Sequence, residues 1–309
     1  MEFIMGGTAA AGAAFFTNPL DVVKVRFQLQ GELKAKGLYA VHYKNLFHAF
    51  FQIAKHDGFL ALQKGLMPAA CHQVVLNGVR LGTYQVAEER GWTMGPDGNV
   101  YILNNIAVGL MAGGAGAFLG SPILLVKTHI QSRSSQQIAV GTQHHIDGIV
   151  KTLGKIYGQF GVRGLFRGAL GAVIRVMVGS ASQLTSFTIF KSYFKRHKIF
   201  SQNEDSIINT FAASMIGGVF IAIFMAPFDT ISTRLYNQGV DQHGKGLLYK
   251  SYMDCVRQTF KQEGIQGLYK GILPCYLRIG PHTVLSLVFW DMLRGIQAKY
   301  SKPPPLLTT

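Results

Sequence analysis

Long apolar runs along the chain alternate with polar stretches. Several of these runs contain Arg, His, Asn or Gln, and such residues within membrane helices usually face a bundle interior or a water-filled cavity. A helix needs about 20 mostly apolar residues to cross a bilayer. The pattern therefore predicts six membrane-spanning helices around a polar centre. We place them near residues 3–28, 69–90, 101–131, 170–191, 207–236 and 273–293.

Two short motifs recur three times in the same order. The first is a proline followed by charged positions near the end of one helix, and the second ends with a basic residue and a glycine. Self-similarity at a fixed period indicates a repeat architecture. We therefore divide the chain into repeats at 1–95, 96–200 and 201–300, with a tail at 301–309. The motifs start at Pro19, Pro122 and Pro227, and they end at Gly65, Gly168 and Gly271.

Each repeat has the same layout, with a polar stretch between its two apolar helices. In the first repeat this stretch contains an amphipathic segment, Tyr43–His56. The predicted fold class is an all-α membrane protein of six transmembrane helices, arranged as three tandem helix-hairpin repeats with short amphipathic helices.

The composition supports a membrane protein and excludes several other classes. Charged residues make up 15% of the chain, against about 25% in a typical soluble domain. The net charge is +15, but the basic residues are scattered, so we expect no nucleic-acid partner. Three dispersed cysteines indicate neither a disulfide framework nor a metal site. We find no catalytic constellation, and we expect no enzyme activity and no cofactor.

The basic residues indicate an orientation. The loops at residues 29–69, 132–169 and 237–272 each carry five Lys or Arg, and the opposite face carries fewer. By the positive-inside rule, the long loops lie on the matrix or cytoplasmic face and both termini lie on the other.

The motifs resemble those of the mitochondrial carrier family, solute carrier family 25, over essentially the whole chain. The first motif reads PLDVVKVR at residues 19–26, and the second contains DG at 57–58 and KG at 64–65. The stretches GSP at 120–122 and GPH at 280–282 are similar to the branch with members 34 and 35, which resembles the oxaloacetate carriers. The resemblance implies three pseudo-symmetric helix hairpins around a central cavity, with the short amphipathic helices on the matrix side. It also implies alternating access at the mitochondrial inner membrane, with both termini towards the intermembrane space.

The resemblance also implies a gate on the matrix side, which we call the matrix gate. Two ion pairs between repeats are expected, and uncharged residues replace the third, so that no buried charge is left unpaired. The family pattern also has a glutamine in each repeat that braces the ion pairs. This sequence has that glutamine in the first two repeats and a tyrosine in the third. The pairs are Asp21–Lys127 and Asp229–Lys24, the uncharged positions are Leu124 and Ser232, and the brace positions are Gln28, Gln131 and Tyr236.

A cytoplasmic gate is implied at the other side, where the family pattern is aromatic-acidic-x-x-basic. Only WDMLR at residues 290–294 is complete. No full ion pair is expected, and one contact joins like charges, so this gate should open easily. The expected neighbours are Gln85 with Lys191, Thr188 with Arg294, and Asp291 with Glu88.

The family pattern places the substrate site on the second helix of each repeat, with a second layer eight residues further along the same helix face. A guanidinium offers a planar fork that matches a carboxylate, so three arginines in one cavity indicate a small anionic metabolite. His72 or Gln183 could then bind a keto or hydroxyl oxygen, although a histidine here is as often a packed core residue. The first positions are His72, Arg175 with Val176, and Arg278, and the second are Arg80, Gln183 and Ser286.

The basic-Gly blocks resemble the family's cardiolipin-binding motif. Backbone donors at a helix start and a nearby cation suit a lipid phosphate, whereas a turn glycine with a solvated cation is the simpler alternative. The residues are Gly65, Arg167, Gly168, Lys270 and Gly271.

We expect a monomeric carrier that exchanges small anionic metabolites such as dicarboxylates or keto acids, including oxaloacetate. The sequence leaves open a carrier of inorganic anions such as sulfate or thiosulfate, and a proton or anion leak protein. Without solute, Arg80, Arg175 and Arg278 should face one another, with no nearby carboxylate on the same faces of these second helices. Their mutual repulsion should then keep the empty carrier from closing.

Overall fold

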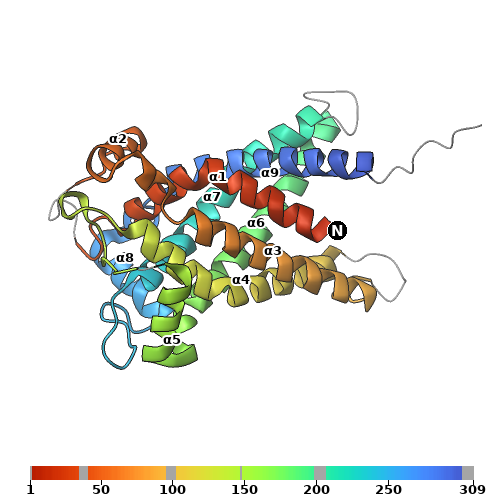
Figure 1. The fold of residues 1–309 in the computed structure, drawn as a ribbon. Helices are drawn as coiled ribbons and strands as arrows, with labels where there is room; N and C mark the ends of the chain where they lie inside the picture. Colours follow the sequence, from red (N-terminus) through yellow and green to blue (C-terminus); the bar gives the residue numbers. More distant parts are fainter. Residues whose placement is uncertain (1, 35–40, 95–101, 147, 198–206, 301–309) are drawn as a thin grey trace, which may run out of the picture.

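The computed structural model describes residues 2–34, 41–94, 102–146, 148–197 and 207–300 of the chain. Over these residues the fold is helical (Figure 1), apart from loops and one isolated bridge between Val240 and Gly246. The long helices are α1 (Glu2–Leu29), α3 (Leu66–Glu89), α4 (Ile102–Ser132), α6 (Ala169–His197), α7 (Ile207–Asn237) and α9 (Ile272–Tyr300). The shorter ones are α2 (Leu46–Asp57), α5 (Ile149–Leu165) and α8 (Tyr252–Leu268), with 3-10 turns η1 (Phe59–Gln63) and η2 (Gln136–Ile138).

The six long helices form a closed ring. Helix α1 packs against α3 and α9, α4 packs against α3 and α6, and α7 packs against α6 and α9. Helices α1, α4 and α7 also contact one another, so the first helices of the three repeats meet inside the ring. The all-α fold of three helix hairpins agrees with the prediction, and each hairpin has a short amphipathic helix between its two long ones.

The proline of the repeated motif lies inside each of these first helices. Pro19, Pro122 and Pro227 lie within α1, α4 and α7, which continue as helices through them. A proline removes one backbone donor and crowds the preceding turn. The charged positions of the first motif follow each proline within about two turns and lie where the three helices meet.

Large apolar side chains lie exposed on the long helices. Phe15 and Phe16 on α1, Phe118 on α4, Leu170 on α6 and Phe224 on α7 are all about half exposed or more. A soluble monomer rarely leaves so many large apolar groups in water, whereas lipid is their natural surrounding.

Hydropathy alone detects only part of this bundle. Of the described helices, Asn104–Ser132 and Met215–Asn237 are long and apolar enough for a span. The bent pair Ile149–Leu165 and Ala169–Gln183 gives a third candidate if it is taken as one span. The other long helices carry polar and charged residues, which the sequence pattern had predicted to face a central cavity.

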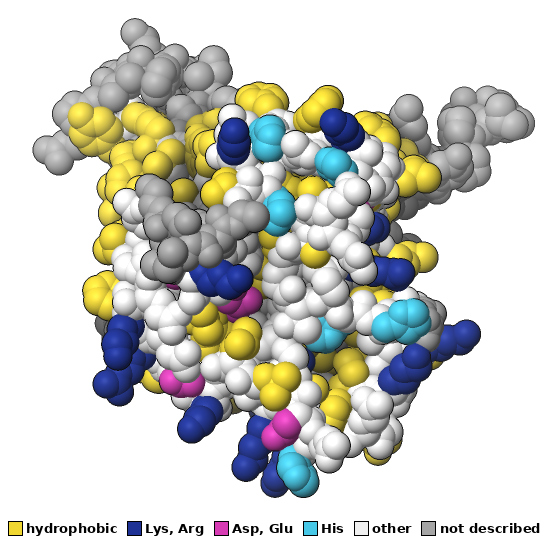
Figure 2. All heavy atoms as spheres, turned by 90° about the vertical axis from the view of Figure 1, so that its left-hand side faces the viewer, with side chains coloured by type: hydrophobic (Ala, Val, Ile, Leu, Met, Phe, Trp, Pro, Cys, Tyr) yellow, Lys and Arg dark blue, Asp and Glu magenta, His cyan; other side chains and the backbone are white. Residues whose placement is uncertain are grey.

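One end of the bundle, which we call the amphipathic end, carries α2, α5 and α8 (Figure 1, left). Figure 2 looks onto this end and shows Lys, Arg and His side chains around it, with few Asp or Glu. Helix α2 starts three residues after the start of the predicted segment Tyr43–His56, because the side chain of Asn45 accepts a hydrogen bond from the His48 N–H at 2.8 Å and so begins the helix there. Asn is a preferred residue at such a helix start.

The three repeats interlock at the glycines that precede α3, α6 and α9. Gly65, Gly168 and Gly271 have positive φ angles of 78°, 84° and 81°, which glycine adopts without strain. Each glycine also touches the brace position of another repeat. A Cβ atom would lie 2.8 Å from Gln131 Cγ at Gly65, 3.1 Å from Tyr236 Cδ1 at Gly168 and 3.1 Å from Gln28 Cγ at Gly271.

Candidate functional site

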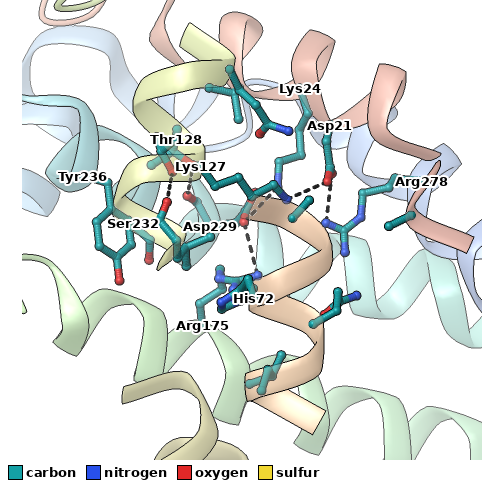
Figure 3. A pocket seen from close by; sticks show the side chains of 18 of the residues that line it. Asp21, Lys24, His72, Lys127, Thr128, Arg175, Asp229, Ser232, Tyr236 and Arg278 are labelled. Carbon is teal, nitrogen blue, oxygen red and sulfur yellow. Dashed lines mark hydrogen bonds and ion pairs between the residues drawn. The ribbon is translucent and has the colours of Figure 1, made fainter. Parts of the chain in front are cut away.

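A central cavity of about 110 Å³ lies inside the ring, and side chains from all six long helices line it (Figure 3). Its polar lining contains most of the predicted matrix gate and the first layer of the predicted substrate site. These residues are Asp21, Lys24, His72, Lys127, Gln131, Arg175, Asp229, Ser232, Tyr236 and Arg278.

Both predicted ion pairs of the matrix gate are present. Lys127 Nζ lies 2.7 Å from Asp21 Oδ2, and this pair joins α4 to α1. Lys24 Nζ lies 2.8 Å from Asp229 Oδ2, and this pair joins α1 to α7. All four side chains are nearly buried. Loss of either partner would therefore leave a buried charge without its counter-charge and would destabilise the closed gate.

The third contact between repeats carries no charge. Leu124 and Ser232 both line the cavity, and the Ser232 hydroxyl donates to the Phe228 carbonyl oxygen at 2.7 Å. Helices α4 and α7 therefore meet here without the ion pair that joins the other two helix pairs.

The brace positions differ from one repeat to the next. The Gln28 amide donates to Asp229 Oδ2 at 2.6 Å, and it accepts from the Thr233 hydroxyl at 2.8 Å. Gln28 thus supports the Lys24–Asp229 pair. The Gln131 amide instead donates to Asn18 Oδ1 at 3.1 Å, and the Tyr236 hydroxyl lies 2.8 Å from Ser121 Oγ.

Arg175 and Arg278 are paired with acids of the first helices, so our expectation that the arginines of the empty site repel one another without neutralisation is wrong. Arg278 Nη1 lies 3.0 Å from Asp21 Oδ1, and Arg175 Nη1 lies 3.7 Å from Asp229 Oδ1. Each carboxylate therefore faces one lysine and one arginine (Figure 3). The physical reason is that α9 adjoins α1 and α6 adjoins α7 in the ring, which brings arginines of the second helices to acids of the first.

The second predicted layer lies away from this cavity. Val176 lines it together with Arg175. Arg80 is half-buried on α3 and Gln183 is exposed on α6, and neither is among the described lining residues. Ser286 on α9 is also outside that lining, and its hydroxyl is buried without a hydrogen-bond partner in the described part of the chain.

His72 is both a packed residue and a lining residue. It is buried, and its Nδ1 lies 3.2 Å from the Gly120 carbonyl oxygen on α4. Because a carbonyl only accepts, Nδ1 must carry the proton, which leaves Nε2 of a neutral ring as an acceptor.

The sequence analysis missed further polar residues of the cavity, and three of them, Thr17, Gln73 and His282, contact one another. His282 Nδ1 lies 3.3 Å from Thr17 Oγ1, and its Nε2 lies 3.1 Å from Gln73 Nε2. Helical spacing could have found two of them, since His282 follows Arg278 by one turn and Thr17 precedes Asp21 by one turn. Together they connect α1, α3 and α9 beside the arginines.

The predicted cytoplasmic gate is only partly described. Gln85 and Glu88 are exposed on α3, and the Gln85 amide donates to Glu89 Oε1 at 3.0 Å. The side chains of the other four predicted members, Thr188, Lys191, Asp291 and Arg294, lie outside the described residues. This gate therefore stays a prediction.

Outside the cavity, the basic-Gly blocks belong to buried ionic links in the first and third repeats. Arg26 Nη2 lies 2.7 Å and Lys64 Nζ 3.6 Å from Asp57 Oδ2. Burial alone would raise the pKa of Asp57, but the Ser135 N–H and Arg26 hold it below its usual value. In the third repeat, Glu263 holds Arg234 at 2.6 Å and Lys270 at 2.5 Å.

Comparisons with known proteins show similarity over the whole chain. The family model described as "Mitochondrial carrier protein" matches three times, at residues 1–93, 98–198 and 203–301. "Solute carrier family 25 member 35" of Mus musculus is 49% identical over 302 residues, which cover 98% of this chain and 100% of that protein.

Two fungal carriers are similar at lower identity. The "Mitochondrial oxaloacetate transport protein" of Schizosaccharomyces pombe is 38% identical over 303 residues, 97% of this chain and 92% of that protein. The "Mitochondrial citrate transporter E" of Aspergillus niger is 39% identical over 299 residues, 96% of this chain and 93% of that protein.

Proposed function

Because the chain belongs to the mitochondrial carrier family, whose members are multi-pass transporters of the mitochondrial inner membrane, we propose that it exchanges small dicarboxylates or keto acids by alternating access. Oxaloacetate is the type of substrate we propose. The relatives named for oxaloacetate and citrate transport support this class, because both solutes are carboxylates.

The charge of the central cavity is the observation that carries the proposal. Its described lining contains four cations, Lys24, Lys127, Arg175 and Arg278, and two carboxylates, Asp21 and Asp229. With neutral histidines this lining has a net charge of +2. One dicarboxylate would neutralise it, and burial of an unbalanced charge is costly.

The arginines supply the recognition chemistry. A substrate carboxylate can take the fork of Arg278 or Arg175 in a bidentate geometry. The neutral Nε2 of His72 can accept a hydrogen bond from a substrate hydroxyl, and the amide of Gln73 can donate to a keto oxygen. Both side chains line the same cavity.

Shared carboxylates link substrate binding to the matrix gate. Asp21 faces both Arg278 and Lys127, and Asp229 faces both Arg175 and Lys24. A substrate that draws an arginine away removes one of the two cations that hold each gate acid. Substrate binding thereby changes the relative stability of the closed and open states, which is the requirement for coupling.

Liposome exchange tests the proposal. Vesicles that contain the purified protein and unlabelled dicarboxylate should take up labelled oxaloacetate or malonate much faster than empty vesicles. Equal uptake into loaded and empty vesicles would contradict exchange. Uptake of sulfate or thiosulfate without any dicarboxylate uptake would contradict the substrate class, and proton conductance without solute exchange would indicate a leak protein.

The proposal also covers the orientation of the protein in the membrane, the lipid that it binds and its oligomeric state. The basic amphipathic end would face the matrix, with both termini towards the intermembrane space and cardiolipin at the helix starts of the basic-Gly blocks. The carrier would act as a monomer. Labelling of a cysteine introduced at either terminus in intact mitoplasts tests the orientation, since an impermeant reagent should then react with it.

A further inference from the structure

The first and third repeats contain the same buried ionic link at the amphipathic end. In each, an arginine from the first long helix and a lysine of the basic-Gly block meet at one carboxylate. Arg26 and Lys64 meet at Asp57, whereas the third repeat brings Arg234 and Lys270 to Glu263. In both repeats the carboxylate precedes the lysine by seven residues in the chain.

The second repeat lacks the carboxylate of this link. His129 stands in the place of the arginine, Phe160 in the place of the acid, and Arg167 in the place of the lysine. The backbone is nevertheless equivalent. A Cβ at Gly164 would lie 2.5 Å from Phe160 Cβ, and one at Gly267 would lie 2.5 Å from Glu263 Cβ.

Arg167 consequently has no acid partner among the described residues. Its Nη2 donates to the Gln238 carbonyl oxygen at 3.3 Å, and its buried Nε has no hydrogen-bond partner within the described ranges. Desolvation lowers the pKa of Arg167 to about 10. A partly buried guanidinium without a counter-charge is unfavourable, because its lost hydration is not replaced.

The guanidinium borders a cavity that could hold a counter-ion. This second cavity, of about 370 Å³, lies between α4, α5 and the loops at 139–146 and 238–246. His129, His144, Lys155, Phe160 and Arg167 line it, and no Asp or Glu is among its described lining residues. It is separate from the central cavity, with which it shares no lining residue.

Two stacked histidines form one wall of this cavity. The rings of His129 and His144 are 3.6 Å apart between centroids. Their Nε2 atoms lie 2.7 and 2.8 Å from the carbonyl oxygens of Tyr236 and Asn237, so these nitrogens carry protons. Burial lowers the pKa of His144, and an anion in the cavity would oppose that shift.

We propose that this cavity binds a free tetrahedral oxyanion such as phosphate or sulfate, in the place of the carboxylate that the other two repeats supply from the chain. The anion pairs with Arg167 and completes the third ionic link. This binding is independent of the proposed transport, because it lies outside the central cavity. A lipid phosphate has the same chemistry, and the experiment separates the two sources.

Thermal unfolding of the full chain in cardiolipin-free detergent tests this inference. At constant ionic strength, replacing chloride by phosphate or sulfate should raise the unfolding temperature of the wild type by a few degrees, because the anion binds the folded state. Phe160→Glu should raise the unfolding temperature without phosphate and should lose the response to it. Phe160→Leu is the matched control without a charge, and it should keep the response.

Four results would overturn the inference. A wild type that responds to neither free phosphate nor cardiolipin has no such site, and an equal response in Phe160→Glu places the anion elsewhere. Arg175→Ala should keep the response, so its loss in that variant would assign the anion to the central cavity. If cardiolipin micelles stabilise the wild type while free phosphate does not, the ligand is a lipid headgroup rather than a free ion.

Discussion

At the scale of single residues, Asp21 and Asp229 decide the electrostatics of the central cavity. Each lies within 4 Å of one lysine and one arginine. Each acid therefore contacts both a lysine of the matrix gate and an arginine of the proposed substrate site. A carboxylate shared between two cations can release one of them without becoming an unpaired buried charge. That property lets an anionic solute take an arginine at low cost.

Arg278 should be required for solute binding. Arg278→Ala should lower the exchange rate roughly 10- to 100-fold, since a hydrogen bond to a charged group contributes about 1.5–3 kcal/mol. The exchange rate of Arg278→Lys should lie between those of the wild type and Arg278→Ala, because an ammonium keeps the charge but lacks the planar fork. Arg257→Ala, at an exposed position of α8, is the matched control and should exchange normally. Undiminished exchange by a folded Arg278→Ala protein would remove this residue from the site.

Glu32 should make stability depend on pH. It follows α1 at the amphipathic end, and its Oε1 accepts from the Tyr249 hydroxyl at 2.9 Å. Burial raises the pKa of Glu32 from 4.5 to about 7; Arg234 and Lys270 oppose this shift, and Glu263 adds to it. Since the folded chain then holds the proton more tightly than the unfolded chain, the free energy of unfolding should fall as pH rises from 4.5 to about 7.

The variant Glu32→Gln isolates this effect. Its amide resembles the protonated carboxyl and cannot ionise, so the fall in stability over that pH range should become shallower. Thermal unfolding at several pH values in a buffer series of constant ionic strength measures both slopes. Identical slopes for wild type and variant would mean that Glu32 titrates at its ordinary pKa.

At the scale of helices, the matrix gate has three contacts between first helices, and among the described residues the α4–α7 contact lacks an ion pair. Leu124→Asp and Ser232→Lys should each destabilise the protein, because each single variant places an unpaired charge in a nearly dry interior. The double variant should recover stability, with a coupling energy of about 1–3 kcal/mol, and should exchange solute more slowly because the closed gate is held more tightly. A double-mutant cycle by denaturation with zero coupling would show that the two positions do not face each other.

Much of the helix arrangement could be predicted from the sequence. Apolar runs located the six long helices. The resemblance to the carrier family, applied to the repeat frame, gave the Asp21–Lys127 and Lys24–Asp229 pairs, and both are present. It also gave the uncharged contact at Leu124 and Ser232, because these two positions of the frame lack the acid and the lysine.

Contacts that depend on side-chain reach could not be predicted. The repeat frame gives the helix face of Arg278, but not that its guanidinium extends to Asp21 across the α1–α9 contact. The same holds for the bond between His72 and the Gly120 carbonyl oxygen. Gln131 matches the brace pattern in sequence, yet its amide donates to Asn18 Oδ1 on α1. In each case the partner lies on another helix, at a distance that the repeat frame does not give.

At the scale of the whole molecule, the interlock of glycines and brace residues joins the three repeats into a ring. Gly168→Ala should lower the free energy of unfolding by more than about 1 kcal/mol, because the φ angle of +84° disfavours Ala and its Cβ would meet Tyr236 at 3.1 Å. Gly154→Ala is the matched control, since its Cβ would meet nothing within 4 Å and Ala favours a helix. If both variants unfold at the same temperature, the Gly168 contact does not hold the repeats together.

The net charge of +2 in the central cavity also has a consequence for the membrane potential. When a dianion fills the cavity, the moving part of the protein is electrically neutral, so one-for-one exchange of dianions transfers no charge. An empty carrier that reoriented would carry its two positive charges through part of the field. Each charge that crosses fully corresponds to about 2.3 kcal/mol per 100 mV. Dianion exchange in liposomes should therefore be insensitive to a potassium diffusion potential, whereas any slow net flux should change with its sign and size. The membrane potential would then oppose reorientation of the empty carrier in one direction, in addition to the electrostatic cost of an unfilled site.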